Sequence, residues 1–336
     1  LTQSLVGLGF KTERLKTGTP PRLLGKSIDW SALSLASGDE DVNYFSIMTN
    51  EKKKPPNTPC YLAHTNKNTH NILSDNLTKS PMYSGKINAT GPRYCPSVED
   101  KIVRFSGRES HQLFLEPEWS GSKQIYINGF STSMPEQVQV DALRSISGLE
   151  KCELIRPGYA IEYDYFPTHQ LKSTLESKNV RGLFMAGQMN GTSGYEEAAA
   201  QGIVAGINAA LSVFCDSCFT VRRDEGYIGV LIDDLITKDI AEPYRMFTSR
   251  AEHRLHLRQD NADIRLSNKA ISLGLLNKEH SKAFVSFYNQ YNSTKETLKN
   301  TTVKHNNKST SSWDFLKRSN ASIFNSSAIK PTNKIS

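Results

Sequence analysis

The most informative pattern of apolar and polar positions lies in residues 181–214, RGLFMAGQMNGTSGYEEAAAQGIVAGINAALSVF. The apolar run GLFMAG predicts a short buried strand, and the glycine-rich GQMNGTSG that follows predicts a turn. YEEAAAQGIVAGINAAL has the composition of a helix, and Glu196 and Glu197 suit the positive end of its dipole. A strand, a glycine-rich turn and a helix N-terminus in this order predict an element that faces an anion or a dinucleotide.

Shorter patterns predict the other elements. LTQSLVGLGF at the start has the pattern of the end of a helix, and Ser133 with Glu136 forms a capping box that predicts a helix beginning there. Residues 219–270 are Arg-rich and have a helical pattern, whereas residues 301–336 are rich in Ser, Asn and Lys and are expected to be disordered. Alternating stretches predict antiparallel strands in CYLAHT, YSGKI, IVRF, QLFLEP and QIYINGF.

Composition limits the class of protein. A chain of 336 residues can form two or three domains, and its five irregularly spaced cysteines argue against a secreted disulfide framework. No apolar run is long enough to span a bilayer, so we expect no membrane role. The net charge is +7, but residues 301–336 carry six basic side chains and one acid, a net +5, which leaves +2 for the rest. RNA binding must therefore be argued from local patches.

Three motifs carry candidate chemistry, each with a structural alternative. The turn has the order GQxNGxxG and lacks the usual GxGxxG fingerprint; it is either a tight strand–helix connection or a surface for a flavin, with Gln188 and Asn190 facing the ligand. Cys95 lies between prolines and close to Arg93, where a guanidinium favours the reactive thiolate, although most isolated cysteines are inert. Cys215-x-x-Cys218 lacks a second ligand pair, and two packed thiols are favoured over a metal or redox site.

An arginine-rich stretch follows in EPYRMFTSRAEHRLHLRQDNADIR. Arg250, Arg254 and Arg258 are four residues apart and would share one face of a helix, with Arg245 extending the positive region. The alternatives are a stripe that contacts RNA phosphates and a solvated face paired with neighbouring acids.

Several long motifs together resemble the GidA/MnmG family, including mitochondrial members, over about residues 1–290. The matching stretches, in order, are RLKTGTPPR, KKPPNTPCYLAHTNKNTH, GPRYCPSVEDKIVRF, IRPGYAIEYDYF, LFMAGQMNGTSGYEEAAAQGIVAGINAA and EPYRMFTSRAEHRLHLRQDNADIRL. The resemblance implies an α/β fold: a partial Rossmann-like FAD domain, an inserted smaller α+β domain and the start of a C-terminal helical domain. The expected boundaries are residues 1–22 and 94–215 for the FAD domain, 23–93 for the inserted NAD-binding domain, 216–300 for the helical domain and 301–336 for the tail.

The resemblance also implies the function. Family members modify C5 of the wobble uridine (U34) in tRNA with a carboxymethylaminomethyl group, or a taurinomethyl group in animal mitochondria. They use FAD, NADH and methylenetetrahydrofolate as the one-carbon donor, and they act with an MnmE-type GTPase. A homodimer within a heteromeric complex and a mitochondrial location are expected on the same basis.

Site residues carry over by position. Cys95 matches a required cysteine, which would either add to C6 of uracil, making C5 nucleophilic, or transfer protons. Gly187, Gln188, Asn190 and Gly191 match the flavin-contacting turn, and Arg245, Arg250, Arg254 and Arg258 fall in the segment associated with tRNA. The region assigned to NAD supplies Gly91, Pro92, Arg93, Tyr94, Glu99, Asp100 and Lys101.

The sequence also departs from the family pattern. It contains no GxGxxG, and the family's pyrophosphate-binding strand and second required cysteine are expected to lie before Leu1, so we interpret the chain as truncated at the N-terminus and at the C-terminal end of the helical domain. Two other functions stay open: a folate- and FAD-dependent tRNA uridine methyltransferase, which lacks the EPYRMFTSRAEHRL region, and a non-catalytic remnant that binds tRNA or the GTPase.

Overall fold

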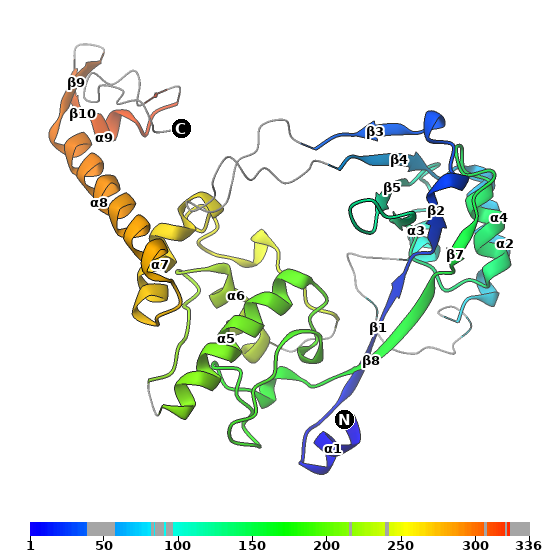
Figure 1. The fold of residues 1–336 in the computed structure, drawn as a ribbon, viewed down its shortest axis with the longest axis horizontal. Helices are drawn as coiled ribbons and strands as arrows, with labels where there is room; N and C mark the ends of the chain where they lie inside the picture. Colours follow the sequence, from blue (N-terminus) through cyan, green and yellow to red (C-terminus); the bar gives the residue numbers. More distant parts are fainter. Residues whose placement is uncertain are drawn as a thin grey trace. The chain divides into compact units, whose positions relative to one another are not determined.

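The computed structural model describes residues 1–38, 58–81, 84, 91, 97–214, 217–238, 242–305, 308–319 and 321–322. The chain divides into two compact units, one formed by Leu1–Val42 with Lys54–Leu257 and the other by Asn43–Lys53 with Arg258–Ser336. Figure 1 shows the elements of both units along the chain. The mixed α/β class expected from the sequence is confirmed.

The first unit contains a six-stranded sheet in the order β3-β4-β5-β6-β2-β7, with every neighbouring pair antiparallel. Its strands are β2 (Arg22–Leu24), β3 (Ser34–Ala36), β4 (Cys60–His64), β5 (Gln112–Pro117), β6 (Gln124–Asn128) and β7 (Leu154–Arg156). Helices α2 (Lys67–Asp75), α3 (Val98–Arg104) and α4 (Glu136–Arg144) share one core with the sheet. Alternation along the strands explains this core, because Leu113 and Leu115 of β5 are fully buried whereas Phe114 between them is 37% exposed.

A long antiparallel ladder leads from this sheet to a second core in the same unit. Strand β1 (Glu13–Thr19) pairs with β8 (Tyr159–Tyr165) over their whole length (Figure 1). Beyond the ladder come α1 (Thr2–Gly7), the short 3-10 turns η5 (Thr168–Gln170) and η6 (Gly187–Asn190), and helices α5 (Tyr195–Val213) and α6 (Tyr227–Thr237). Phe10, Phe166, Met185, Val204 and Ile232 are among the buried residues that join these elements. The ladder therefore links the sheet to the helices that carry the glycine-rich turn.

The second unit consists of α7 (Ala262–Ser272), α8 (Lys278–Asn300), the hairpin β9 (Thr302–His305) and β10 (Lys308–Ser311), and α9 (Ser312–Phe315). The expectation of disorder from residue 301 onward is wrong for residues 302–305 and 308–315, which form these strands and α9. Val303 and Ser312 are buried, and Lys295 of α8 lies 5.6 Å from the centre of the Trp313 ring. Few apolar residues are sufficient here because they pack on the end of a long helix.

Two predicted elements differ from the structure. The helix expected to begin at Ser133 begins at Glu136 with Pro135 as its N-cap, because Ser133 is buried and its hydroxyl lies 2.7 Å from the Ser80 hydroxyl. The stretch IVRF, expected as a strand, belongs to α3, where Ser97 accepts a hydrogen bond from the Asp100 N–H and caps the helix. The helix cap at Ser97, which precedes IVRF in the sequence, thus favours a helical conformation for this stretch.

The remaining strand predictions gave mixed results. CYLAHT, QLFLEP and QIYINGF contain β4, β5 and β6, as predicted, and YSGKI lies almost wholly outside the described residues. GLFMAG forms no named strand and makes only an isolated bridge between Phe184 and Glu176. In the described part of the chain, no helix combines the length and apolar character needed to cross a bilayer.

Candidate functional site

The glycine-rich turn predicted from the sequence lies between β8 and helix α5. Gly187 and Gly191 have φ values of +83° and +76°, a backbone conformation that favours glycine. Gly194 is the N-cap of α5, and a Cβ there would overlap the Glu197 carboxylate. The three glycines therefore allow the backbone to turn tightly onto the start of α5.

Hydrogen bonds beneath the turn hold it in one conformation. Gln201 of α5 accepts from the Gly187 N–H at 3.1 Å and from the Asn190 amide at 2.8 Å. Its own amide donates to Thr192 Oγ1 at 3.0 Å, and Thr192 donates to the Gly187 carbonyl. Gln201 and Asn190 are fully buried, so the turn is preorganised by the helix that follows it. We did not identify Gln201 from the sequence, since a glutamine in a helix of small residues has no distinctive spacing.

Two buried oxygen atoms at the turn have no hydrogen-bond partner among the described residues, Asn190 Oδ1 and Glu197 Oε2. Both atoms are acceptors, and burying an acceptor without a donor is unfavourable. A ligand that presents hydroxyl or ring N–H donors would satisfy them. The ribityl chain and isoalloxazine ring of a flavin present such donors, so the residues of this turn fit the cofactor expected from the sequence.

Gln188 is exposed at the same turn, next to Tyr163 of β8. Burial raises the pKa of Tyr163, and the Gln188 amide opposes this shift. The Tyr163 phenol therefore stays protonated near neutral pH, as a neutral group beside the turn.

A segment from the arginine-rich stretch packs directly onto this turn. The Tyr244 N–H donates to the Gly191 carbonyl at 2.8 Å, and the Met246 N–H donates to Glu197 Oε1 at 2.7 Å. Arg245 Nε lies 3.7 Å from Glu197 Oε1, and the Arg245 side chain is 39% exposed. Arg245 was expected to contact tRNA, and the turn was expected to contact flavin. The structure places Arg245 at the mouth of this turn, although Arg245 and Glu197 are about fifty residues apart in the sequence.

A buried carboxylate fixes this segment against α6. Asp234 is fully buried and receives hydrogen bonds from Lys238 Nζ at 2.6 Å, Arg223 Nη1 at 2.7 Å and the Tyr244 hydroxyl at 2.9 Å. Burial alone would raise its pKa, but these three donors lower it below the ordinary value. Arg250 stacks on the Tyr244 ring at 4.5 Å and donates to the Arg245 carbonyl.

Arg250, Arg254 and Arg258, predicted to share one face of a helix, do not lie on a common helix. Residues 242–261 contain only the short 3-10 turns Thr248–Arg250 and Gln259–Asn261. Near their start, the backbone contacts of Tyr244 and Met246 with Gly191 and Glu197 hold the chain in a non-helical path. Arg250 contributes to the internal contacts, whereas Arg254 is exposed. Arg258 belongs to the second unit and pairs with Asp260 at 3.6 Å.

The stretch expected to bind NAD is described only in part. Pro92, Arg93, Tyr94 and Cys95 lie outside the described residues. A Cβ at Gly91 would lie 3.3 Å from Lys16 Cε of β1, so this glycine lies against the ladder.

Helix α3 supplies the other predicted NAD-binding residues. Glu99 is fully buried and accepts from Thr132 Oγ1 at 2.8 Å and from the Ser133 N–H at 2.9 Å. Lys101 Nζ donates to the Gly129 carbonyl at 2.7 Å, and Asp100 lies 3.8 Å from Arg104. Glu99 and Lys101 thus anchor α3 to the loop after β6, and their role toward a cofactor stays a prediction.

One face of α5 is open in the first unit. A Cβ at Gly202 or Gly206 would meet no described atom within 4 Å, and Ile203 and Val213 are 51% and 76% exposed. This part of α5 therefore has no described atoms packed closely against its glycines.

Three comparisons with known proteins agree. The family model described as "Glucose inhibited division protein A" matches residues 1–215. A Lactobacillus johnsonii protein named "tRNA uridine 5-carboxymethylaminomethyl modification enzyme MnmG" is 54% identical over 304 residues, which is 90% of this chain and 48% of the relative. A Chlorobium luteolum protein of the same name is 54% identical over 276 residues, 82% of this chain and 44% of the relative.

Solved structures agree with the sequence relatives. A crystal structure of Aquifex aeolicus GidA, form I, superposes with a TM-score of 0.84 at 50% identity and covers 93% of this chain and 52% of that protein. The form II crystal gives a TM-score of 0.82 at 48% identity over 93% of this chain and 51% of that one. The chain spans about half the length of the relatives it matches. The glycine-rich turn and the arginine segment packed against it agree with these matches in sequence and structure. The chain belongs to the Glucose inhibited division protein A (GidA/MnmG) family.

Proposed function

We propose that this chain contributes to an FAD-dependent enzyme that modifies C5 of the wobble uridine U34 in tRNA with a carboxymethylaminomethyl or taurinomethyl group. One observation carries the proposal: 54% identity over 90% of the chain to a relative named for tRNA uridine 5-carboxymethylaminomethyl modification. The geometry of the glycine-rich turn supports it, because this turn offers unpartnered acceptors and an arginine in one place.

The flavin would be held by Gly187, Gln188, Asn190 and Gly191. Asn190 Oδ1 and Glu197 Oε2 would accept hydrogen bonds from its hydroxyl or N–H groups, and the glycines leave the backbone accessible to the ring. When bound, flavin supplies two-electron redox chemistry to the reaction. The contribution of this chain is to bind and orient the ring, because Gln201 and Thr192 hold the turn rigid.

The RNA would reach the same region. Arg245 is partly exposed at the mouth of the turn and Arg254 is exposed nearby in sequence, so both side chains are available to phosphates. Cys95 would serve as nucleophile or proton carrier toward uracil. NADH, methylenetetrahydrofolate, an MnmE-type GTPase, a homodimer within a heteromeric complex and a mitochondrial location complete the proposal, each on the basis of family resemblance.

The absorbance spectrum of the purified protein tests cofactor binding. We expect the visible absorbance of oxidised flavin to remain with the protein after reconstitution with FAD and removal of the free cofactor. A protein that stays colourless in excess FAD would contradict the flavin part of the proposal and favour a non-catalytic chain that binds tRNA or the GTPase.

A second experiment tests the chemistry. Cys95→Ser would be introduced into a chain of the relatives' full length and expressed in cells that lack their own enzyme, and U34 nucleosides would be measured by mass spectrometry. We expect loss of the C5 modification, whereas the matched control Cys218→Ser at an exposed position should retain it. Normal modification in the Cys95 variant would remove this cysteine from the mechanism.

A further inference from the structure

Two phenols lie on the same face of the β1–β8 ladder and differ in their partners. Tyr163 and Tyr165 are two positions apart on β8, so their side chains share one face. The Tyr165 hydroxyl donates to Glu13 Oε2 at 2.5 Å, and Glu13 is the residue directly opposite on β1. Tyr163 lies opposite Leu15, which is buried. The ladder therefore supplies a carboxylate to Tyr165 and an alkyl side chain to Tyr163.

The Tyr163 hydroxyl is buried and has no hydrogen-bond partner among the described residues. The Gln188 amide is close enough to oppose the effect of burial on the pKa of Tyr163, yet it does not reach the geometry of a hydrogen bond. Because burial raises this pKa, the phenol keeps its proton near neutral pH and can donate. Burying a phenol without a partner is unfavourable, so the folded chain gains stability when a ligand supplies an acceptor.

Tyr163 belongs to the strand that leads into the glycine-rich turn. The Phe166 N–H, directly after β8, donates to the Met189 carbonyl at 2.8 Å and fastens the end of the strand to η6. Two further buried oxygens at this turn, Asn190 Oδ1 and Glu197 Oε2, are also unpartnered among the described residues, and both are acceptors. Tyr163 is therefore the donor among these three buried oxygens.

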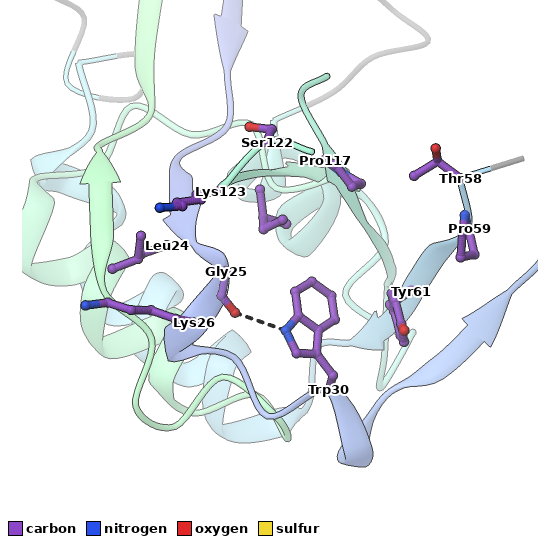
Figure 2. Close-up of a pocket in the computed structure, with 11 residues that line it drawn as sticks. Leu24, Gly25, Lys26, Trp30, Thr58, Pro59, Tyr61, Pro117, Ser122 and Lys123 are labelled. Atoms are coloured by element: carbon purple, nitrogen blue, oxygen red, sulfur yellow. Dashed lines mark hydrogen bonds between the residues drawn. The ribbon is translucent and has the colours of Figure 1, made fainter. Parts of the chain in front are cut away.

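The pocket of about 690 Å³ at the end of the six-stranded sheet shows the contrast (Figure 2). Its Trp30 indole N–H already donates to the Gly25 carbonyl at 3.0 Å. The ammonium ends of Lys26 and Lys123 are directed away from Trp30. The labelled polar groups of that pocket therefore do not converge on a ligand, whereas the three unpartnered oxygens belong to the glycine-rich turn, the first turn of α5 and the strand beside them.

We propose that the Tyr163 hydroxyl donates a hydrogen bond to the edge of the flavin ring and so orients the cofactor at the turn. This inference rests on the proposed function, because it takes flavin as the ligand of the turn. The edge of the isoalloxazine ring consists mainly of carbonyl oxygens and ring nitrogens, which need donors, whereas the ribityl hydroxyls can donate to Asn190 and Glu197. Tyr163 thus supplies the proton that the two acceptors lack, and hydrogen bonds to the ring tune its electronic properties.

Two tyrosine-to-phenylalanine variants separate the roles of the two phenols. The unaltered protein, Tyr163→Phe and Tyr165→Phe are each titrated with FAD, and the visible absorbance of the flavin reports both its affinity and the environment of its ring. We expect Tyr163→Phe to weaken FAD about tenfold and to change the absorbance of the bound ring, because a hydrogen bond from a buried group is lost. Tyr165→Phe should leave the affinity within about twofold and the spectrum unchanged, because its hydroxyl is committed to Glu13.

Urea denaturation of the apoprotein gives an independent readout that a purely structural role would move the other way. Tyr163→Phe removes an unpartnered hydroxyl, so its urea midpoint should not fall. Tyr165→Phe removes a hydrogen bond made in the folded chain, so its midpoint should fall.

The outcomes distinguish this inference from the proposed function. An unchanged FAD affinity in Tyr163→Phe, or an apoprotein midpoint lowered as much as in Tyr165→Phe, would overturn the role of Tyr163 and leave flavin binding by the chain standing. Failure of the unaltered protein to bind FAD would overturn the flavin part of the proposed function, and the role of Tyr163 with it.

Discussion

Replacement of Asp234 by alanine should release the arginine segment from the glycine-rich turn. Among the described residues, Asp234 is the one carboxylate that contacts Arg223, Lys238 and Tyr244 together, and it is fully buried. Its loss leaves the Tyr244 hydroxyl with only the Met246 sulfur, 3.8 Å away, as an acceptor. It also removes the buried partner of Arg223, Lys238 and Arg250. Because Tyr244 carries the backbone contact to Gly191, the effect should extend to the turn itself.

The magnitude follows from the burial of each partner. Removal of one member of a buried ion pair destabilises proteins by about 3–5 kcal/mol. The Arg223 and Lys238 side chains are 24% and 55% exposed, so water can solvate part of the charge that Asp234 leaves behind. The buried Tyr244 hydroxyl keeps only the weak sulfur acceptor of Met246, so it adds about 1 kcal/mol, the lower end for an unsatisfied group. We therefore expect a loss near the lower end, about 3 kcal/mol in the free energy of unfolding.

Asp233 supplies the matched control on the same helix. It contacts Arg223 at 2.9 Å but is 44% exposed, so Asp233→Ala should cost less than about 1 kcal/mol. Urea denaturation measures both variants, and hydrogen exchange of amides 242–252 locates the effect. Similar losses of under about 1 kcal/mol in the two variants would refute the reasoning, because burial would then not distinguish the two carboxylates.

The same carboxylate should make stability depend on pH. Hydrogen bonds from Lys238, Arg223 and Tyr244 outweigh burial and hold the pKa of folded Asp234 below its ordinary 3.8. Its contribution is therefore complete above that value and is lost as pH falls through the lower folded pKa. The alanine variant should show a shallower loss of stability below about pH 4 than the unaltered protein.

Three further predictions concern other residues. Gly194→Ala places a Cβ into the Glu197 carboxylate and should weaken flavin retention, measured by the absorbance of the purified variant, while far-ultraviolet circular dichroism stays unchanged. Burial lowers the pKa of His111 below 6.5, so the free energy of unfolding should fall as pH drops below about 6.5. His111→Gln should make this dependence of stability on pH shallower in urea titrations, and an unaltered dependence would contradict the burial argument. Cys152 is fully buried and burial raises its pKa, whereas Cys218 is exposed. A thiol reagent should therefore modify Cys218 first, as peptide mass spectrometry would show, and equal rates would indicate that the core opens readily.

Local patterns in the sequence were sufficient for much of the fold. The strands β4, β5 and β6 follow from alternation, and α5 follows from its composition and its glycine-rich approach. Failures occurred where a distant partner decided the conformation. Ser133 has the spacing of a cap, yet its hydroxyl lies beside Ser80, and IVRF alternates like a strand but follows the cap at Ser97.

The candidate site shows the same division. Sequence pointed to Gly187 and Gly191, because a tight turn needs residues that tolerate its backbone conformation, and to Asn190 as a side chain that would face a ligand. It did not point to Gln201, whose amide holds the turn, since that role depends on contacts rather than on spacing. The helical arrangement predicted for Arg250, Arg254 and Arg258 failed, because residues 242–261 form only two short 3-10 turns. Contacts of Tyr244 and Met246 with α5 and α6 fix the backbone at the start of this stretch instead.

The sequence by itself determined the family, the class of fold and the position of the glycine-rich turn, because these depend on residue type at short spacing. Only the tertiary structure joined Arg245 to Glu197 and enclosed Asp234 among three donors. Arg245 and Glu197 lie 48 residues apart in the sequence, and burial decides which of the many polar side chains interact. Neither the partner nor the burial of a side chain is written in its local sequence.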